Sequence, residues 1–201
     1  MAFSKPYTDM SASVPAAIPE SEPDDEALVL AARIDPEAFG KLMERYEAPL
    51  TRYLMRLTGW ASEEVEDILQ EAFIKAYRNL NDYDSSLKFS AWLYRITHNQ
   101  AIDILRRHTA SPVRFEWSLE DMARLIPAAN DTQAELITQE HIGHIRRAIA
   151  ALPERYREVL VLRFLEEKSY EEIVDILKMP KGSVATAVKR GKELLHKQLE
   201  A

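Results

Sequence analysis

The stretch 169-SYEEIVDILKMPKGSVATAVKRGKELLHK-197 decides the fold of the C-terminal part of the chain. Ser169, followed three residues later by Glu172, has the spacing of a capping box and predicts the start of a helix. A short turn containing Gly182 is expected next, and Ser183 is the expected N-cap of a second helix that ends in cations. Two helices joined by a short turn with glycine are typical of a helix-turn-helix unit that reads DNA.

The second of these helices is expected to have two different faces. Its apolar face consists of Val184, Ala187, Val188, Gly191, Leu194 and Leu195. The opposite face carries Ala185, Thr186, Lys189, Arg190 and Lys192, and Lys181 and Ser183 stand at the positive helix start, which suits a phosphate. Cations on this face can hold phosphates, and methyl groups can contact a thymine methyl. The alternative is a solvated basic surface helix, but the capped helix and turn before it favour DNA binding.

The overall charge of the chain argues against DNA binding only weakly. The 201 residues carry a net charge of −7, from 26 basic and 33 acidic side chains. Residues 1–26 and 116–140 each carry −5, so the rest of the chain carries +3. Both acidic segments have the composition of poorly folded chain, so the pI says little about the folded parts.

Composition sets further limits on the class of protein. Apolar residues make up 46%, and five glycines leave the chain poor in turn residues, which favours helix. Cysteine is absent, which excludes disulfides, thiol catalysis and thiolate metal sites, and fits a reducing compartment. No apolar run approaches the roughly 18 residues of a membrane span, and the N-terminus lacks the apolar core of a secretory signal. We therefore expect a cytoplasmic protein with a disordered acidic tail over residues 1–23.

Helical periodicity covers the N-terminal half after that tail. We expect helices over about 25–34, 36–58, 62–80 and 89–107, with Ser62 as the N-cap of the third and a loop over 81–88. The expected buried stripe of the second helix is Phe39, Leu42, Met43, Tyr46, Leu50, Tyr53, Leu54 and Leu57. That of the third is Val65, Ile68, Leu69, Ala72, Phe73, Ala76, Tyr77 and Leu80.

Residues 109–134 are rich in proline and acids and have weak periodicity, so we expect a linker with scattered apolar anchors. Helices should resume over 135–151 and 153–166. The predicted fold is all-α: two small helical domains, 24–108 and 135–201, joined by a flexible acidic linker.

Two further patterns suggest binding surfaces. A second stripe on the third helix, Asp67, Gln70, Glu71 and Ile74, follows the i, i+3, i+4, i+7 spacing of one helix face. It is either a solvated acidic face or a surface that docks on a partner helix. In the fourth helix, Arg95, Arg106 and Arg107 stand beside Trp92 and Tyr94, which suits stacking on unpaired bases, although a core helix with a basic end would look similar.

No pattern of catalytic residues emerges. The five histidines are scattered, and His141 and His144, which share a helix face, lack a third ligand for a metal. There is no Gly-rich phosphate loop, nucleophile elbow or carboxylate pair. The sequence predicts no catalytic residue, no metal site and no cofactor.

Together the motifs resemble those of a known family, the extracytoplasmic-function (group IV) sigma factors of bacterial RNA polymerase. The stretch DILQEAFIKAYRNL (67–80) looks like the polymerase-binding helix of the first sigma domain, and FSAWLYRITHNQAIDILRR (89–107) looks like its promoter-melting helix. The stretch LPERYREVLVLRFLEEKSYEEIVDILKMPKGSV (152–184) looks like the second sigma domain. The order and spacing of the three motifs make the resemblance specific.

This resemblance implies a role for each surface, with core RNA polymerase and promoter DNA as partners and an anti-sigma factor left open. Asp67, Gln70, Glu71 and Ile74 match positions that dock on the clamp helices of the polymerase. Tyr83, Tyr94 and Asn99 match the pocket for a flipped base of the −10 element, and Arg95, Arg106 and Arg107 would hold the neighbouring backbone. Lys181, Ser183, Ala185, Thr186, Lys189 and Arg190 would meet the −35 element.

The sequence departs from the family pattern at two positions, and its helix-turn-helix motif also allows other functions. The family usually has cations where Ala185 and Ala187 stand, so we expect a weaker −35 contact or different preferred bases. A stand-alone helix-turn-helix regulator is the main alternative function, although it leaves the first domain unexplained. The other alternative is a small helical enzyme, for which the sequence offers no set of site residues.

Overall fold

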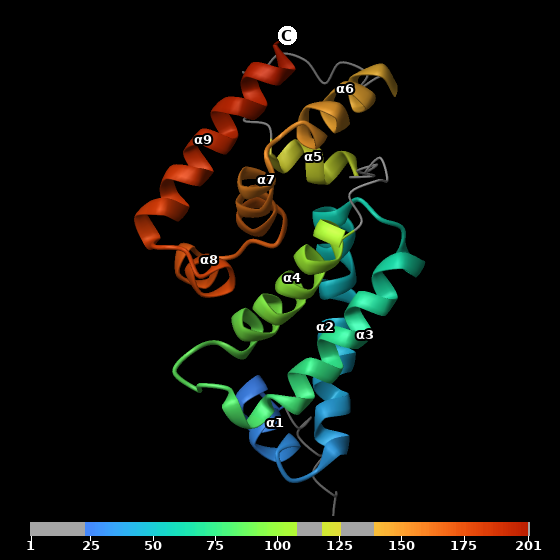
Figure 1. Cartoon of the computed structure of the whole chain (residues 1–201), viewed down its shortest axis with the longest axis vertical. Coiled ribbons are helices and arrows are strands. Elements are labelled where there is room, and N and C mark those ends of the chain that lie inside the picture. The colour runs from blue at the N-terminus through green and yellow to red at the C-terminus, as the bar shows by residue number, and fades with distance from the viewer. Residues whose placement is uncertain (1–22, 108–117, 126–138, 201) are drawn as a thin grey trace, which may run out of the picture.

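The computed structural model describes residues 23–107, 118–125 and 139–200, and these residues form helices and no strand (Figure 1). The helices are α1 (Asp25–Ala32), α2 (Pro36–Thr58), α3 (Ser62–Arg78), the 3-10 turn η1 (Leu80–Asp82), α4 (Phe89–Arg107), α5 (Leu119–Leu125), α6 (Gln139–Ala150), α7 (Glu154–Leu160), the π-helical turn η2 (Val161–Leu165), α8 (Tyr170–Leu177) and α9 (Lys181–Leu199). The predicted all-α class is confirmed. Within the described residues no helix has both the length and the apolar character to cross a membrane.

The first domain is built around α2, which packs against α1, α3 and α4. Its apolar stripe supplies the centre of the core, with Leu50, Tyr53 and Leu54 fully buried. The helix ends at Gly59, whose φ of 72° is the left-handed conformation that glycine adopts without steric cost. Met43 and Tyr77, both expected in the buried stripes, are instead 38% and 43% exposed.

The second domain is built around α9, which packs against α6, α7 and α8. The predicted capping box is confirmed: Ser169 Oγ accepts from Glu172 N at 3.2 Å, and Glu172 Oε2 accepts from Ser169 N at 2.9 Å. Gly191 allows α9 to approach α7 closely, since a Cβ there would lie 3.1 Å from Leu160 Cγ. The apolar face predicted for α9 is buried, apart from the half-buried Leu194.

Two predicted helix caps are wrong. The helix expected to be capped by Ser62 begins at that residue, with Ala61 in the cap position and the Glu64 carboxylate accepting from its backbone N–H. Likewise α9 begins at Lys181 rather than after Ser183, because Pro180 takes the cap position and its carbonyl already accepts from the Ser183 and Val184 amides at 2.8 and 3.1 Å. The turn is made by residues 178–180, so Gly182 lies inside the helix.

Within the predicted linker, 109–134, the structure contains a short helix, α5, that the sequence analysis did not anticipate. A helix of this length is not stable by itself, so tertiary contacts must hold it. Leu125 is buried, and Asp121 is bonded to Arg56 of α2 at 2.6 Å. The acidic side chains of the predicted linker are therefore not all solvated. The same holds for the acidic segment near the N-terminus, where Asp25 pairs with Arg45 at 2.6 Å.

The two domains lie against each other along α4. Figure 1 shows α4 between the α2–α3 pair on one side and α8 on the other, and α4 packs against both α3 and α8. The second domain thus covers part of the α4 surface that the first domain leaves open.

Candidate protein and nucleic-acid interfaces

The four residues of the second α3 stripe, Asp67, Gln70, Glu71 and Ile74, are all exposed on one face. Beside them runs a groove between α2 and α3, made of two adjoining hollows of about 640 and 630 Å³ that share Met43, Gln70 and Phe73. Ile74 and Tyr77, 52% and 43% exposed, line the second hollow. An acidic rim beside an open apolar groove has the form of a surface that takes a helix.

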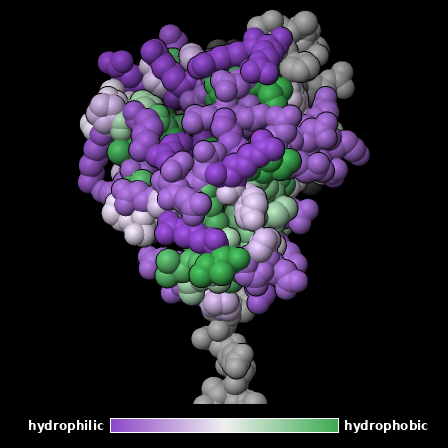
Figure 2. All heavy atoms as spheres, turned by 60° about the horizontal axis from the view of Figure 1, so that its bottom comes forward, coloured by the Kyte–Doolittle hydropathy of each residue, from purple (hydrophilic) through white to green (hydrophobic). Residues whose placement is uncertain are grey.

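A second apolar surface lies at the end of the molecule that carries α1. Figure 2 shows apolar patches in a hydrophilic surface at that end. Leu30 in α1 is 62% exposed and Ile34, in the turn after it, is 90% exposed. The periodic patterns in the sequence did not predict that these two residues form an exposed apolar surface.

The two tyrosines predicted for a base pocket lie in separate environments. The Tyr83 ring packs on Phe89 and Trp92, with centroids 5.6 and 5.3 Å apart. The Tyr94 ring packs on Tyr53 at 5.0 Å and lies under Lys168 of the second domain, whose Nζ is 4.0 Å from the ring centroid.

Exposure also differs among the residues predicted to meet −10 DNA. Both tyrosines are buried, with 4% and 2% exposure for Tyr83 and Tyr94. Arg95 is half-buried, and the exposed ones are Asn99, Arg106 and Arg107. Asn99, Arg106 and Arg107 are therefore open to solvent, while the two tyrosines are not.

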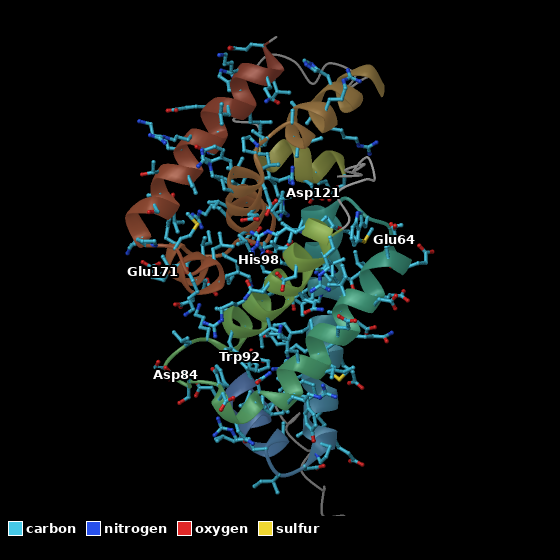
Figure 3. The ribbon with its side chains drawn as sticks, in the orientation of Figure 1. Glu64, Asp84, Trp92, His98, Asp121 and Glu171 are labelled. Carbon is cyan, nitrogen blue, oxygen red and sulfur yellow. The ribbon has the colours of Figure 1, made fainter. Side chains whose placement is uncertain are left out.

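His98 marks the centre of the domain contact. Figure 3 shows it on the side of α4 that faces the second domain. Its Nδ1 lies 2.8 Å from Tyr53 Oη, and its Nε2 lies 4.0 Å from Glu158 Oε2 of α7. Burial, with a smaller contribution from Arg106, lowers the pKa of His98 to about 4. Burial, together with a hydrogen bond from Glu154, raises the pKa of Glu158 to about 7.

The residues predicted to meet −35 DNA all lie on the exposed face of α9. These are Lys181, Ser183, Ala185, Thr186, Lys189 and Arg190. Lys192, expected on the same face, is half-buried with its Nζ 4.3 Å from the Phe164 ring centroid. Of the two alanines at positions where the resemblance leads us to expect cations, Ala187 is buried and Ala185 is exposed.

Arg155 of α7 joins this face, and sequence reasoning missed it. It lines a hollow of about 390 Å³ together with Ser183, Thr186 and Arg190 of α9. Arg155 lies outside the helix-turn-helix motif, and its position became evident from the packing of α7 on α9.

The described part of the chain contains no group of three or more His, Asp or Glu side chains placed to hold a metal ion. His144 is half-buried in α6, and the side chain of His141 is outside what the structure describes.

Comparison with known families matches both domains. The model described as "Sigma-70 region 2" matches residues 42–111, and the one described as "Sigma-70, region 4" matches residues 143–195. The chain belongs to the sigma factors of RNA polymerase. It is similar to the ECF RNA polymerase sigma factor SigW of Bacillus subtilis, with 35% identity over 170 residues, 82% of this chain and 90% of the relative. It is also similar to the ECF RNA polymerase sigma-E factor of Escherichia coli K12, with 32% identity over 171 residues, 83% of this chain and 88% of the relative.

Solved structures support the fold of this sigma factor. The structure of CnrH in complex with the cytosolic domain of CnrY has a TM-score of 0.63 at 24% identity, covering 88% of this chain and 97% of that chain. The sigma factor RpoE in complex with the anti-sigma factor NepR from Bartonella quintana has a TM-score of 0.57 at 20% identity, covering 81% of this chain and 97% of that one. The stand-alone helix-turn-helix regulator is not favoured, since the first domain also matches a sigma region.

Proposed function

We propose that this ECF sigma factor docks on core RNA polymerase through α3, reads the −10 element with α4 and reads the −35 element with α9, and that it does so in the cytoplasm and without chemistry of its own. The observation that carries the proposal is the exposed face of α9, where every residue implied for −35 contact is open to solvent. Docking would hold two weak DNA contacts at fixed separation, so their affinities combine through effective concentration.

The docking part of the proposal rests on α3 and the groove beside it. Asp67, Gln70, Glu71 and Ile74 would contact the polymerase clamp helices, and the exposed Met43 and Tyr77 would line the groove that receives apolar side chains. Apolar side chains exposed side by side often mark a binding site, and docking would explain why Met43 and Tyr77 are not buried in the domain core.

Run-off transcription with purified core polymerase tests the docking surface. The double substitution Asp67→Ala/Gln70→Ala is expected to reduce transcript yield on the order of tenfold at limiting sigma factor, because central interface contacts dominate binding. The matched control is Lys41→Ala/Glu44→Ala, which changes two exposed residues of α2. Unchanged transcription in the α3 variant, or an equal loss in the control, would remove the docking assignment.

The −10 part assigns the base pocket to Tyr83, Tyr94 and Asn99, with Arg95, Arg106 and Arg107 on the backbone. Flipping a base costs a few kcal/mol, offset by stacking and hydrogen bonds in the pocket. Since both tyrosines are buried against other side chains, the pocket must open before it can take a base.

The −35 part adds Arg155 to the six residues of α9. In the holoenzyme, Lys189→Ala is expected to lower the slope of log affinity against log salt by about 1, as for the loss of one phosphate contact. Arg155→Ala is expected to do the same. Lys197→Ala, an exposed cation near the far end of α9, serves as the control and should leave the slope unchanged. An unchanged slope in Lys189→Ala and Arg155→Ala would contradict the assignment of this face.

We also propose an anti-sigma factor as a partner, by analogy with the solved complexes of CnrH with CnrY and RpoE with NepR. Such a protein, purified and added to the run-off reaction, should stop transcription, and excess core polymerase should restore it. If transcription persists at a saturating amount of every candidate inhibitor, the proposal fails.

A further inference from the structure

The turn after η2, residues 166–169, covers the base-stacking tyrosine of α4. Glu166 Oε2 accepts a hydrogen bond from Tyr94 Oη at 2.9 Å, so the hydroxyl is occupied. Lys168 Nζ lies 4.0 Å from the Tyr94 ring centroid, so one ring face is occupied by a cation. Tyr94 is consequently only 2% exposed.

An arginine of the first domain holds this turn in place. Arg56 donates to Glu166 Oε1 at 2.7 Å, to the Leu165 carbonyl at 3.1 Å and to Asp121 of α5 at 2.6 Å. The Arg56 and Glu166 side chains are 17% and 6% exposed, so the pair is largely shielded from water. Removing one partner of a shielded pair strongly destabilises the contact, because the other charge stays buried and unpaired.

The backbone of the turn is shaped for this contact. The chain passes through the π-helical turn η2, an element that is uncommon and often marks functional sites. Glu167 then takes a φ of 53°, which is unfavourable for a residue with a side chain. As a result Glu166 and Lys168 both reach Tyr94, while Glu167, 75% exposed, meets only Arg124 among the ion pairs of the described residues.

A second contact fastens the other end of α4. Lys88, just before α4, pairs with Glu172 of α8 at 3.3 Å. The second domain therefore spans α4 from its start to His98, which faces Glu158.

We propose that the 166–169 turn is an internal plug: in the free chain Glu166 and Lys168 occupy the hydroxyl and the ring face of Tyr94 that an unpaired base would use, and Arg56 fastens the plug. This inference rests on the proposed role of Tyr94 in −10 recognition. A base and the plug cannot occupy the ring together, so the free chain binds single-stranded DNA only in the fraction of molecules whose domains have separated. Polymerase docking favours that separated state.

The absence of cysteine from the sequence makes this inference directly testable. Cysteines introduced at Glu44 and Lys197, exposed on α2 and α9, take spin labels that report the distance between the two domains. The test variant is Glu166→Gln, which keeps the size of the side chain and removes its charge. The matched control is Glu167→Gln, the same change at the neighbouring, exposed position.

Two quantities are measured on the full chain: the inter-label distance distribution, and the affinity for a short random-sequence pool of single-stranded DNA. Glu166→Gln is expected to shift the distances to longer values and to tighten DNA binding about tenfold, since apparent affinity scales with the open fraction. Lys168→Gln, which removes the cation over the ring, should act in the same direction. Glu167→Gln should match the wild type in both.

The outcomes separate the plug from the proposed function. Wild-type distances and affinity in both Glu166→Gln and Lys168→Gln overturn the plug, and so does an equal gain in Glu167→Gln, which would reflect charge alone. Longer distances without tighter DNA binding also overturn it. Run-off transcription with core polymerase is measured in parallel on the same proteins. The transcript yield of the plug variants should equal that of the wild type. If the wild type itself supports no transcription, the proposed function is overturned and not the plug.

Discussion

Replacing Glu158 by glutamine should stabilise the protein at neutral pH and not at acidic pH. Glu158 lies at the domain contact with its side chain 12% exposed, 4.0 Å from His98 Nε2. Burial and the bond with Glu154 raise its pKa from 4.5 to about 7. Because the folded state then holds the proton more tightly than the unfolded chain, this stabilising contribution is complete below about pH 4.5 and is lost as the pH rises through about 7.

The size of the effect follows from the two pKa values. At 1.36 kcal/mol for each pKa unit, the wild type loses about 3 kcal/mol between these limits through Glu158 alone. Glutamine resembles the protonated acid and does not titrate. The unfolding free energy of Glu158→Gln minus that of the wild type should therefore be near zero at pH 4.5 and rise to about 3 kcal/mol above pH 7.

Urea unfolding followed by circular dichroism at several pH values between 4 and 8 measures this difference. The other ionisable groups largely cancel in the subtraction. A difference that stays flat with pH, or a variant less stable than the wild type above pH 7, would refute the reasoning. The control is His98→Gln, whose pH dependence should have the opposite sign.

The sign for His98 follows from its lowered pKa. Its pKa falls from 6.5 to about 4 in the folded state, so the unfolded chain binds the proton more tightly. The wild type thus loses stability as the pH falls below 6.5, and His98→Gln removes that loss. The unfolding free energy of His98→Gln minus that of the wild type should therefore rise toward acidic pH. At neutral pH this difference should be negative, because the variant lacks the bond between His98 and Tyr53.

Three further predictions concern the second domain and are checked by urea unfolding. Gly143→Ala should stabilise the protein by about 1 kcal/mol through helix propensity. Gly191→Ala should stabilise it less or destabilise it, because the new Cβ would lie 3.1 Å from Leu160 Cγ. Equal effects of the two substitutions would contradict the packing of α9 on α7. Ser169→Ala should cost about 1 kcal/mol by removing a helix cap, and no loss would mean that the capping box contributes nothing. Lys178→Gly should stabilise by about 1 kcal/mol, because Lys178 has a φ of 53°; destabilisation would argue against that backbone conformation.

The elements with continuous periodicity could be predicted from the sequence. The helices α2, α3 and α4 appear close to their expected bounds because apolar residues recur at three and four positions over several turns. The capping box of Ser169 was predicted for a similar reason, since both partners are local. Local signals failed where proline competed, as at the start of α9, and where burial depended on distant chain, as for α5.

The candidate sites were likewise predictable where one helix forms them, and not where distant parts of the chain meet. The exposed face of α9 follows from helical spacing, and so does that of α3. The burial of Tyr94 could not be predicted, because it depends on Glu166 and Lys168, more than seventy positions along the chain. Arg155 was missed for the same reason, since only the packing of α7 on α9 brings it to the −35 face.

The chemistry of the domain contact bears on whether it can open. Two ion pairs cross it, Arg56 with Glu166, which is largely shielded from water, and Lys88 with Glu172, whose lysine is exposed. They lie beside the buried His98 and beside apolar side chains, because the buried apolar residues of the two domains form one continuous cluster. Desolvating the charges of the shielded network of Arg56, Asp121 and Glu166 costs nearly as much as their attraction returns, so this network adds little net stability while it is complete. The apolar part of the contact has no such opposing cost, and separating it exposes its surface to water. The ionised groups regain hydration when the domains part, which offsets part of that cost and lowers the free energy that polymerase docking must supply. A contact built in this way is specific when closed and still separable.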